Sequence, residues 1–315
     1  MEIAEELSTV KPIKDTAITI GVFDGVHLGH LSLLHHLNKV AESNGWCSIV
    51  ITFKLHPEMV LDSSKPVTWL ENLNMRISQI KKAGIDYVVA LDFSTELSRL
   101  TAEEFMQLLK DHLKLKLLII GPDFALGKNR EGNADQLRII GEKIGFKVEV
   151  MPPLILNGEI VSSSLIRRML AGGNLQKANK LLGRNFSVQG EVVSGERRGA
   201  TLGFPTANIE IEREQFLLPD GVYATVSYLN GQTFPSVTNI GTCPTFSGTK
   251  RVVETHVIDK KLDLLAKMLK IEFVEKLRDE QCFENETQLK IQIEKDIHQA
   301  KVLLDELESK KNQSR

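Results

Sequence analysis

Two histidines and three glycines lie within residues 21–30, which read Gly-Val-Phe-Asp-Gly-Val-His-Leu-Gly-His. The apolar residues 17–20 predict a buried strand before this stretch, and apolar residues at helical spacing over 31–41 predict a helix after it. Glycines let the backbone approach a ligand closely, and the free amides and dipole at a helix start favour bound phosphate. The imidazoles of His27 and His30 can add hydrogen-bond donors and positive charge toward a leaving phosphate. The stretch therefore predicts a phosphate-binding turn between a strand and a helix.

The same residues resemble the His-x-Gly-His signature of the nucleotidyltransferase superfamily. The longer pattern Gly-x-Phe-Asp-Gly-x-His-x-Gly-His resembles the prokaryotic FAD synthetases, which couple a riboflavin kinase to an FMN adenylyltransferase. One departure is Val22, where that family usually has Asn. The resemblance implies that His27 and His30 are catalytic. It also implies that the rest of the turn binds nucleotide, through Gly21, Phe23, Asp24, Gly25 and Gly29.

The composition limits the class of protein. A chain of 315 residues accommodates two domains, and 42% hydrophobic with 25% charged residues is typical of globular proteins. The net charge of −2 disfavours a nucleic-acid binder held by phosphate contacts. The acidic start lacks the apolar core of a signal peptide, no apolar run approaches the ~20 residues of a membrane span, and the three cysteines lie far apart. We therefore expect a cytoplasmic protein without a membrane or nucleic-acid partner.

Alternating apolar patterns predict a doubly wound, mainly parallel α/β sheet in the first half. Strands are expected at 47–53, 87–91, 116–120 and 147–150, with helices at about 71–83 and 101–113. Ligands of such sheets lie at the carboxyl ends of the strands, which makes His56 a candidate. From the residues alone, a surface histidine beside Pro57 explains it equally well. A His-Pro follows this strand in the FAD synthetases too, and that resemblance favours a nucleotide contact.

Residues 121–132 hold three glycines with basic residues between them. Their composition suits a loop that wraps a ligand, and a polar surface loop equally well. The stretch resembles the Gly-x-Asp/Asn-Phe-x-Phe-Gly loop of the FAD synthetases, which implies that Asp123 and Phe124 lie in the nucleotide site. Leu126 departs from the second Phe of that pattern.

Three consecutive serines, residues 162–164, precede apolar positions of a predicted helix. They can cap the helix or hold phosphate oxygens, and Arg167 one turn later is either solvated or a fork for phosphate. The run resembles Ser-Ser-Thr-x-Ile-Arg, the second superfamily signature, with Ser164 in the place of Thr. The resemblance implies that Ser163 and Ser164 bind nucleotide and that Arg167 is catalytic. The reaction would be in-line adenylyl transfer, in which the FMN phosphate attacks ATP and pyrophosphate leaves.

The pattern changes after Gly183, which closes a predicted helix over 174–182. Short alternating runs and an Asn-Gly hairpin signal at 230–231 predict a small antiparallel β-barrel. These runs are 186–193, 221–229, 232–240, 251–258 and 268–274. A long amphipathic helix over about 286–307 follows, and we expect its Lys-rich tail to be frayed. The expected domains are therefore 1–183, Rossmann-like, and 184–315, a barrel with a terminal helix.

Residues 199–208 form a rigid turn in which Gly199, Gly203 and Pro205 precede a strand. Thr206 and Asn208 alternate to the same side of that strand, and their oxygens suit Mg²⁺ carrying ATP phosphates. A glycine-rich hairpin with outward polar residues has the same composition. The stretch resembles the Gly-x-x-x-Gly-x-Pro-Thr-Ala-Asn signature of riboflavin kinases, which implies that these five residues bind nucleotide, Thr206 and Asn208 also through the metal.

Two further stretches, residues 239–246 and 277–280, resemble the riboflavin kinases, and the likeness implies that Arg278 and Glu280 bind flavin. In that family the Glu of a Glu-x-His strand takes the proton from the riboflavin 5′-hydroxyl, which here is Glu254. A carboxylate within reach of an alcohol beside the γ-phosphate of ATP is what general-base phosphoryl transfer requires. Leu265-Ala266 departs from the Tyr-Gly of many relatives.

The resemblances extend over about residues 13–307 and predict a bifunctional enzyme. Its barrel would phosphorylate riboflavin with ATP, and its first domain would adenylylate FMN to FAD, with Mg²⁺ accompanying ATP. We expect a monomer or weak homo-oligomer. One alternative is another nucleotidyltransferase, which the kinase-like second half disfavours. The other is a flavin- or nucleotide-binding regulator, or a monofunctional enzyme with one inactive domain, which the departures leave open.

Overall fold

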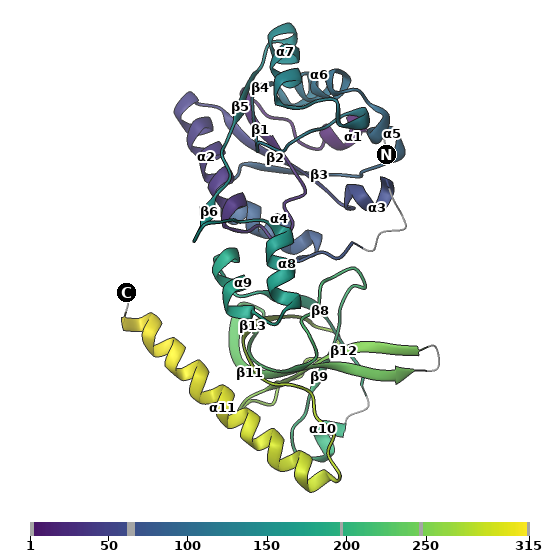
Figure 1. Ribbon diagram of the computed structural model, residues 1–315, viewed down its shortest axis with the longest axis vertical. Helices are drawn as coiled ribbons and strands as arrows, with labels where there is room; N and C mark the ends of the chain where they lie inside the picture. The colour runs from purple at the N-terminus through teal and green to yellow at the C-terminus, as the bar shows by residue number, and fades with distance from the viewer. Residues whose placement is uncertain (1–2, 62–66, 196–197, 246–247, 314–315) are drawn as a thin grey trace. The chain divides into compact units, whose positions relative to one another are not determined.

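The computed structural model describes residues 3–61, 67–195, 198–245 and 248–313 (Figure 1). By its contacts the chain forms two compact units, Met1–Ser163 and Ser164–Arg315. Phe246 of the riboflavin kinase-like stretch 239–246 and residues 314–315 of the tail lie outside the described residues.

A five-stranded parallel sheet forms the centre of the first unit, in the order β3-β2-β1-β4-β5. Its strands are β1 Thr16–Ile20, β2 Cys47–Phe53, β3 Tyr87–Leu91, β4 Leu115–Ile120 and β5 Lys147–Val150. The order reverses on either side of β1, and such a switch point is where open α/β sheets bind ligands at the carboxyl ends of the strands. The doubly wound sheet predicted from the apolar runs is confirmed.

Helices cover both faces of this sheet (Figure 1). Successive residues of β1 alternate between two hydrophobic clusters, so that Ile18 packs with the helix carrying Phe105, and Ala17 packs with the helix carrying Leu34. The helices are α1 Ile3–Leu7, α2 Leu28–Asn44, α3 Pro57–Leu61, α4 Leu73–Lys82, α5 Thr95–Arg99, α6 Ala102–Leu113 and α7 Ala134–Ile144. A 3-10 turn, η1 Lys128–Arg130, and a small hairpin of β6 Ile155–Leu156 and β7 Glu159–Ile160 complete the unit.

A closed antiparallel barrel forms the second unit, with strand order β10-β11-β12-β9-β8-β13. The strands are β8 Ser187–Val193, β9 Ala207–Glu210, β10 Gly221–Leu229, β11 Gln232–Thr245, β12 Gly248–Val257 and β13 Met268–Arg278. The helices are α8 Ser163–Ala171, α9 Leu175–Leu182, α10 Arg198–Thr201 and α11 Glu286–Gln313. Asn230 and Gly231 turn between β10 and β11 with positive φ angles of 49° and 80°, which confirms the hairpin.

Five buried hydroxyl groups connect three neighbouring barrel strands. The Oγ1 of Thr225 lies 2.9 Å from Ser236 Oγ and 2.8 Å from Thr238 Oγ1. Ser227 donates to Ser236, and Thr238 in turn lies 2.8 Å from Thr255 Oγ1. We call this set the hydroxyl ladder. It satisfies the hydrogen bonds of polar groups that burial would otherwise penalise.

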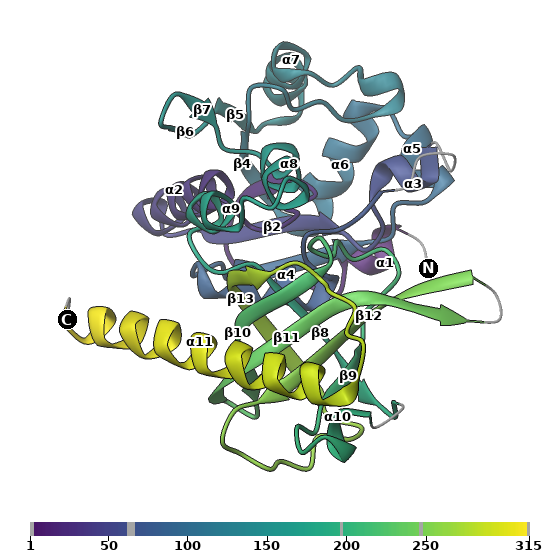
Figure 2. The same ribbon diagram turned by 60° about the horizontal axis from the view of Figure 1, so that its bottom comes forward.

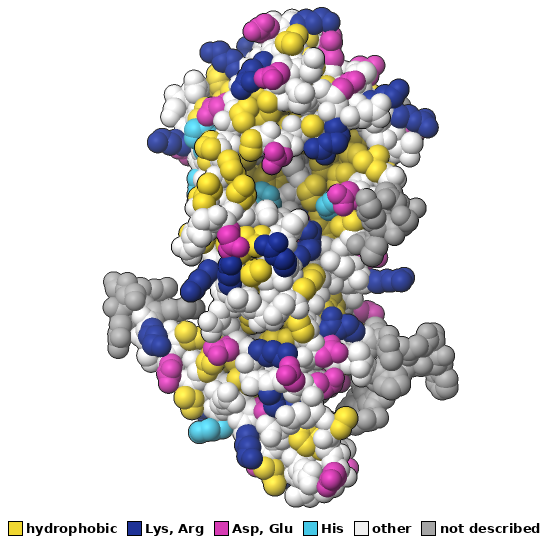
Figure 3. Space-filling view, in the orientation of Figure 1, with side chains coloured by type: hydrophobic (Ala, Val, Ile, Leu, Met, Phe, Trp, Pro, Cys, Tyr) yellow, Lys and Arg dark blue, Asp and Glu magenta, His cyan; other side chains and the backbone are white. Residues whose placement is uncertain are grey.

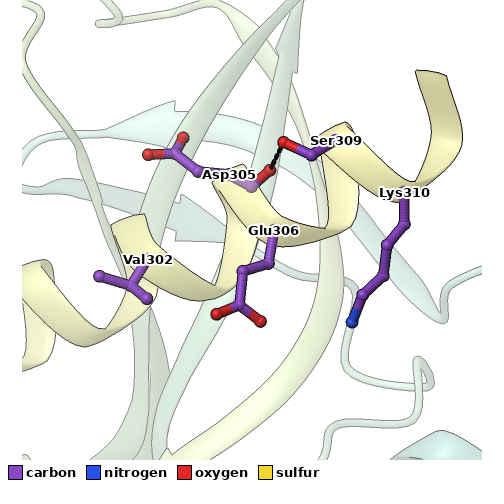
Figure 4. Close-up of a pocket in the computed structure, with 5 residues that line it drawn as sticks. All are labelled: Val302, Asp305, Glu306, Ser309 and Lys310. Carbon is purple, nitrogen blue, oxygen red and sulfur yellow. Dashed lines mark hydrogen bonds between the residues drawn. The ribbon is translucent and has the colours of Figure 1, made fainter. Parts of the chain in front are cut away.

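Helix α11 lies across the barrel strands (Figure 2), where Ile297, Ala300 and Leu303 pack against Ala224 and Ile258. It continues to Gln313 instead of ending near residue 307, so the prediction of a frayed tail is wrong for residues 308–313. No Gly or Pro interrupts these residues, and Lys310 follows Glu306 at the favourable spacing of four. A hollow of about 500 Å³ follows the exposed side of this helix, lined by Val302, Asp305, Glu306, Ser309 and Lys310 (Figure 4). None of these residues belongs to a predicted site.

Candidate active sites

The turn at residues 21–30 joins β1 to α2 at the carboxyl edge of the sheet. Phe23, Gly25 and Val26 have positive φ angles of 51°, 75° and 31°. Only glycine adopts this region without cost, so the backbone at Phe23 and Val26 is strained. Both side chains are buried in a hydrophobic cluster, and their packing offsets that strain. Such strain is typical of loops shaped by a ligand-binding requirement.

The two histidines of the turn stack on each other at the start of α2. Their ring centroids are 3.7 Å apart and their planes differ by 14°. His27 is the N-cap residue, and its Nδ1 accepts the backbone N–H of His30 at 3.3 Å, so the neutral ring carries its proton on Nε2. A Cβ at Gly29 would be 3.2 Å from the His27 ring and from the Val161 carbonyl, so the glycine makes room for the imidazole. The pair therefore sits at the positive end of a 17-residue helix, where anions bind favourably.

Asp24 and Ser163 connect this turn to two other segments. The Asp24 carboxylate, only 2% exposed, accepts the backbone N–H of Leu70 at 2.9 Å and of Glu71 at 3.3 Å. Ser163 Oγ donates to the Asp24 carbonyl at 2.8 Å. Both predicted nucleotide-binding residues thus hold the shape of the turn. Ser164 and Arg167 follow on α8 in the second unit, and their roles stay predictions.

Arg76 contacts the histidine turn and Trp69 contacts His56, although no sequence motif indicated either residue. Arg76 is 1% exposed and donates to the Val22 carbonyl at 2.7 Å and to the Phe53 carbonyl at 3.0 Å. Its guanidinium carbon lies 4.0 Å from the centre of the Trp69 ring, and that ring lies 5.2 Å from His56. The sequence carries one sign of the unusual position of Arg76. It lies four positions before the buried Ile80, so it is a charged residue on the apolar face of α4.

The loop over residues 121–132 folds back against the start of α6. A Cβ at Gly127 would be 2.6 Å from the Ala102 nitrogen, and one at Gly132 would be 2.6 Å from the Ala102 side chain. These two glycines therefore serve close packing within the protein. Phe124 packs half-buried against the core and Asp123 is exposed, so their nucleotide contacts stay predictions.

Glu254 lies between two asparagines on the barrel. In the strand register it stands opposite Asn208 of β9 on one side and Asn239 of β11 on the other. Side chains directly opposite each other in antiparallel strands have Cβ atoms about 5 Å apart. Glu254 and Asn208, which come from separate motifs, are therefore neighbours on one face, and Asn239, the first residue of the riboflavin kinase-like stretch 239–246, joins them there.

The glycine-rich backbone comes close to the predicted metal ligands. A Cβ at Gly195 would collide with the Asn208 amide, and one at Gly199 would be 3.3 Å from Thr206 Oγ1. Gly203 has a φ of +95°, and the Pro205 carbonyl lies 2.9 Å from His256 Nδ1. Gly195 and Gly199 therefore allow close packing of the backbone against Asn208 and Thr206, and metal binding by these two residues stays a prediction.

The two predicted flavin contacts differ in their surroundings. The carboxylate of Glu280 lies directly over Gly241, where a Cβ would collide with it. The Arg278 guanidinium forms an ion pair with Asp296 of α11, with Nε 3.0 Å from both carboxylate oxygens and Nη2 2.8 Å from Oδ2. Glu280 therefore shares the Asn239 region of β11, whereas Arg278 fastens α11 to the barrel. A flavin contact by either residue stays a prediction.

Two properties of the described residues concern metal binding and membranes. No group of three or more His, Cys, Asp or Glu side chains in the described ranges could hold a metal ion. Within that same part of the chain, no helix is both long and apolar enough to cross a lipid bilayer. On the face in view in Figure 3, acidic and basic side chains are interspersed, in keeping with a net charge of −2.

Comparisons with known proteins cover almost the whole chain. A family model described as FAD synthetase matches residues 10–165, and one described as riboflavin kinase matches residues 182–304. A relative from Haemophilus influenzae is 36% identical, covering 92% of this chain and 94% of its own. Relatives from Escherichia coli and Pseudomonas fluorescens are also 36% identical, covering 90% and 96% of this chain and 91% and 98% of their own. All three are named bifunctional riboflavin kinase/FMN adenylyltransferase.

A solved structure is similar over the same length. It comes from Streptococcus pneumoniae, is described as a macrolide-efflux protein, and has a TM-score of 0.85 at 28% identity. The match covers 94% of this chain and 96% of that chain, so the two proteins share both the parallel-sheet unit and the barrel.

Proposed function

The chain belongs to the family of bifunctional riboflavin kinases/FMN adenylyltransferases, and on this premise we propose that each of the two candidate sites performs one of the two reactions. The chain is an enzyme with a FAD synthetase domain and a riboflavin kinase domain. It phosphorylates riboflavin to FMN and adenylylates FMN to FAD.

Adenylyl transfer is assigned to the turn at residues 21–30. The stacked imidazoles of His27 and His30 at the start of α2 carry this assignment, because they place donors where helix amides and dipole already favour phosphate. His56, Asp123 and Phe124 would contact the nucleotide, and Ser163, Ser164 and Arg167 would bind its phosphates. The FMN phosphate is itself the nucleophile, so the protein contributes positioning and charge stabilisation.

Riboflavin phosphorylation is assigned to the barrel face that carries Glu254. Its carboxylate would accept the proton of the riboflavin 5′-hydroxyl as that oxygen attacks the γ-phosphate of ATP. Thr206 and Asn208 would hold Mg²⁺ with the ATP phosphates, because hydroxyl and amide oxygens are ligands that this ion accepts. When bound, the ion would neutralise phosphate charge. Glu280 and Arg278 would contact the flavin from the end of β13.

The domain limits assigned to the two activities are residues 1–183 and 184–315. Two other divisions of the chain can be compared with these limits. The contact units meet at residues 163 and 164, and residues 166–181 lie between the stretches that the two family models match. Expressing two fragments split after Gly183 tests the assignment. Each fragment is expected to retain one reaction, and loss of both reactions on splitting would contradict two self-contained sites.

A single incubation tests the function as a whole. Purified protein is mixed with riboflavin, ATP and Mg²⁺, and the flavins are separated by chromatography over time. FMN is expected first and FAD after it, whereas FMN supplied directly should yield FAD without riboflavin. Failure to form either flavin nucleotide would favour a flavin- or nucleotide-binding regulator, and formation of only one would indicate an inactive second domain.

We further propose that the enzyme works in the cytoplasm as a monomer or weak homo-oligomer, without nucleic acid. The near-balanced charge and the interspersed surface charges support the last point. Sedimentation at micromolar protein with and without an oligonucleotide measures both the oligomeric state and nucleic-acid binding. A stable oligomer, or co-sedimentation with the oligonucleotide, would contradict this proposal.

A further inference from the structure

A buried arginine joins three separate parts of the adenylyl-transfer region. Arg76 Nη1 donates to the Val22 carbonyl at the start of the histidine turn and lies 3.2 Å from the Thr52 hydroxyl. Its Nη2 donates to the Phe53 carbonyl at the end of β2, three residues before His56. The two nitrogens of one rigid, planar group thus fix the distance between the turn and the end of the neighbouring strand.

The Arg76 guanidinium is also connected to His56, through the ring of Trp69. Trp69 is buried and lies over the guanidinium at 4.0 Å, with its ring 5.2 Å from the His56 ring. The segment that carries Trp69 is fastened to the turn as well, because Leu70 and Glu71 donate their backbone N–H groups to the Asp24 carboxylate. Arg76 and Asp24 therefore both connect the turn to the segment that carries Trp69.

We propose that Arg76 is a positioning residue for FMN adenylylation, which sets the turn carrying His27 and His30 at a fixed distance from His56. This inference depends on the proposed assignment of adenylyl transfer to that turn. Arg76 acts through main-chain carbonyls and through Trp69, so it needs no contact with ATP or FMN. Because about 1 Å of misplacement can cost roughly 10²-fold in rate, its loss should affect the chemistry strongly.

The test compares three variants of the full-length enzyme. Arg76→Met keeps much of the length and removes every hydrogen bond, and Arg76→Lys keeps the charge but not the planar fork. Arg138→Met is the matched control, because Arg138 is an exposed arginine on α7 of the same unit, paired with Asp135. For each variant, kcat and the KM values for ATP and FMN are measured in adenylylation. Riboflavin phosphorylation by the same sample serves as the internal reference, and Trp fluorescence reports on the Trp69 environment.

The separation of kcat from KM distinguishes positioning from simple stability. A variant that only unfolds in part loses active molecules, so its apparent kcat falls while the KM of the folded remainder is unchanged. We expect Arg76→Met to lower kcat/KM for adenylylation by roughly 10²-fold with a raised KM for ATP, and Arg76→Lys to lie between it and wild type. FMN formation should be unchanged in all three variants, and Arg138→Met should behave as wild type in both reactions.

Two results would overturn the proposal: unchanged KM values in Arg76→Lys, or wild-type adenylylation in a folded Arg76→Met variant. If Arg76→Met fails to fold, Arg76→Lys alone decides. A His30→Ala variant measured alongside distinguishes failure of this proposal from failure of the proposed site assignment. If it retains full FAD formation, the assignment of the site fails, whatever the Arg76 variants show.

Discussion

The ion pair between Arg278 and Asp296 leads to the most quantitative prediction. It joins β13 to α11 through three nitrogen–oxygen contacts of 2.8–3.0 Å, with side chains only 15% and 5% exposed. Asp296→Ala leaves the guanidinium in this site without its carboxylate partner. Removing one partner of a buried pair typically costs about 3–5 kcal/mol, because the remaining charge stays desolvated. With a typical urea dependence of about 2 kcal/mol per M, the unfolding midpoint of the barrel unit should fall by about 1.5–2.5 M.

The positions of the tryptophans allow the stability of each unit against urea to be measured separately. The two tryptophans of the chain, Trp46 and Trp69, both belong to the first unit. Urea unfolding followed by Trp fluorescence should therefore be the same in Asp296→Ala and wild type, whereas riboflavin phosphorylation should be lost at lower urea. Asp305→Asn, an exposed change nine residues further along α11, is the control and should shift neither curve. An unchanged kinase midpoint, or an equal shift in both curves, would refute the reasoning.

Three other predictions concern the reactions and their pH range. Glu254→Gln should reduce riboflavin phosphorylation by about 10²–10⁴-fold while added FMN is still converted to FAD; undiminished phosphorylation would remove Glu254 as the base. His30→Ala should do the reverse, lowering FAD formation by roughly 10²–10³-fold with FMN formation intact, and normal FAD output would exclude it from the mechanism. Burial raises the pKa of Tyr223 to about 12, and burial together with the Glu272 hydrogen bond raises the pKa of Tyr228 as well. Since both folded-state pKa values exceed the unfolded value of about 10, the stability that neutral phenols provide is complete below pH 10 and is lost as pH rises toward about 12. Phenolate absorbance should appear later in native than in urea-unfolded protein, and coincident titrations would contradict these shifts.

Local patterns in the sequence were enough to predict most of the fold. Apolar runs at period two or in continuous stretches marked the strands, and the Asn230-Gly231 pair marked a hairpin whose positive φ angles require such residues. Helix α7 has no counterpart among the predicted helices, although Asn133 caps its start and Gly145 its end. Strands β11 and β12 are longer than predicted, because their pairing continues beyond Ile240 to Thr245 and back from Gly248.

The site was predictable where a motif is continuous in sequence and unpredictable where distant residues meet. The stacking of His27 on His30 follows from their spacing at a helix start. In contrast, Arg76 contacts carbonyls 54 and 23 positions away along the chain, and nothing in the local pattern specifies those partners. The Arg278–Asp296 pair is likewise not predictable from the local sequence, because it depends on where α11 lies on the barrel.

The hydroxyl ladder inside the barrel has a consequence for how its strands align. A shift of β11 by one residue would replace Ser236 and Thr238 by Val237 and Asn239 at the positions facing Thr225 and Thr255. The displaced hydroxyls would turn outward, and those left inside would lose their partners. An interior of plain hydrocarbon would tolerate such slippage better than this interior does. Misaligned barrels are therefore less stable than the native barrel. Because Thr255 is adjacent to Glu254, the same loss of stability keeps the Glu254 carboxylate on the face of the barrel that it occupies in the native register.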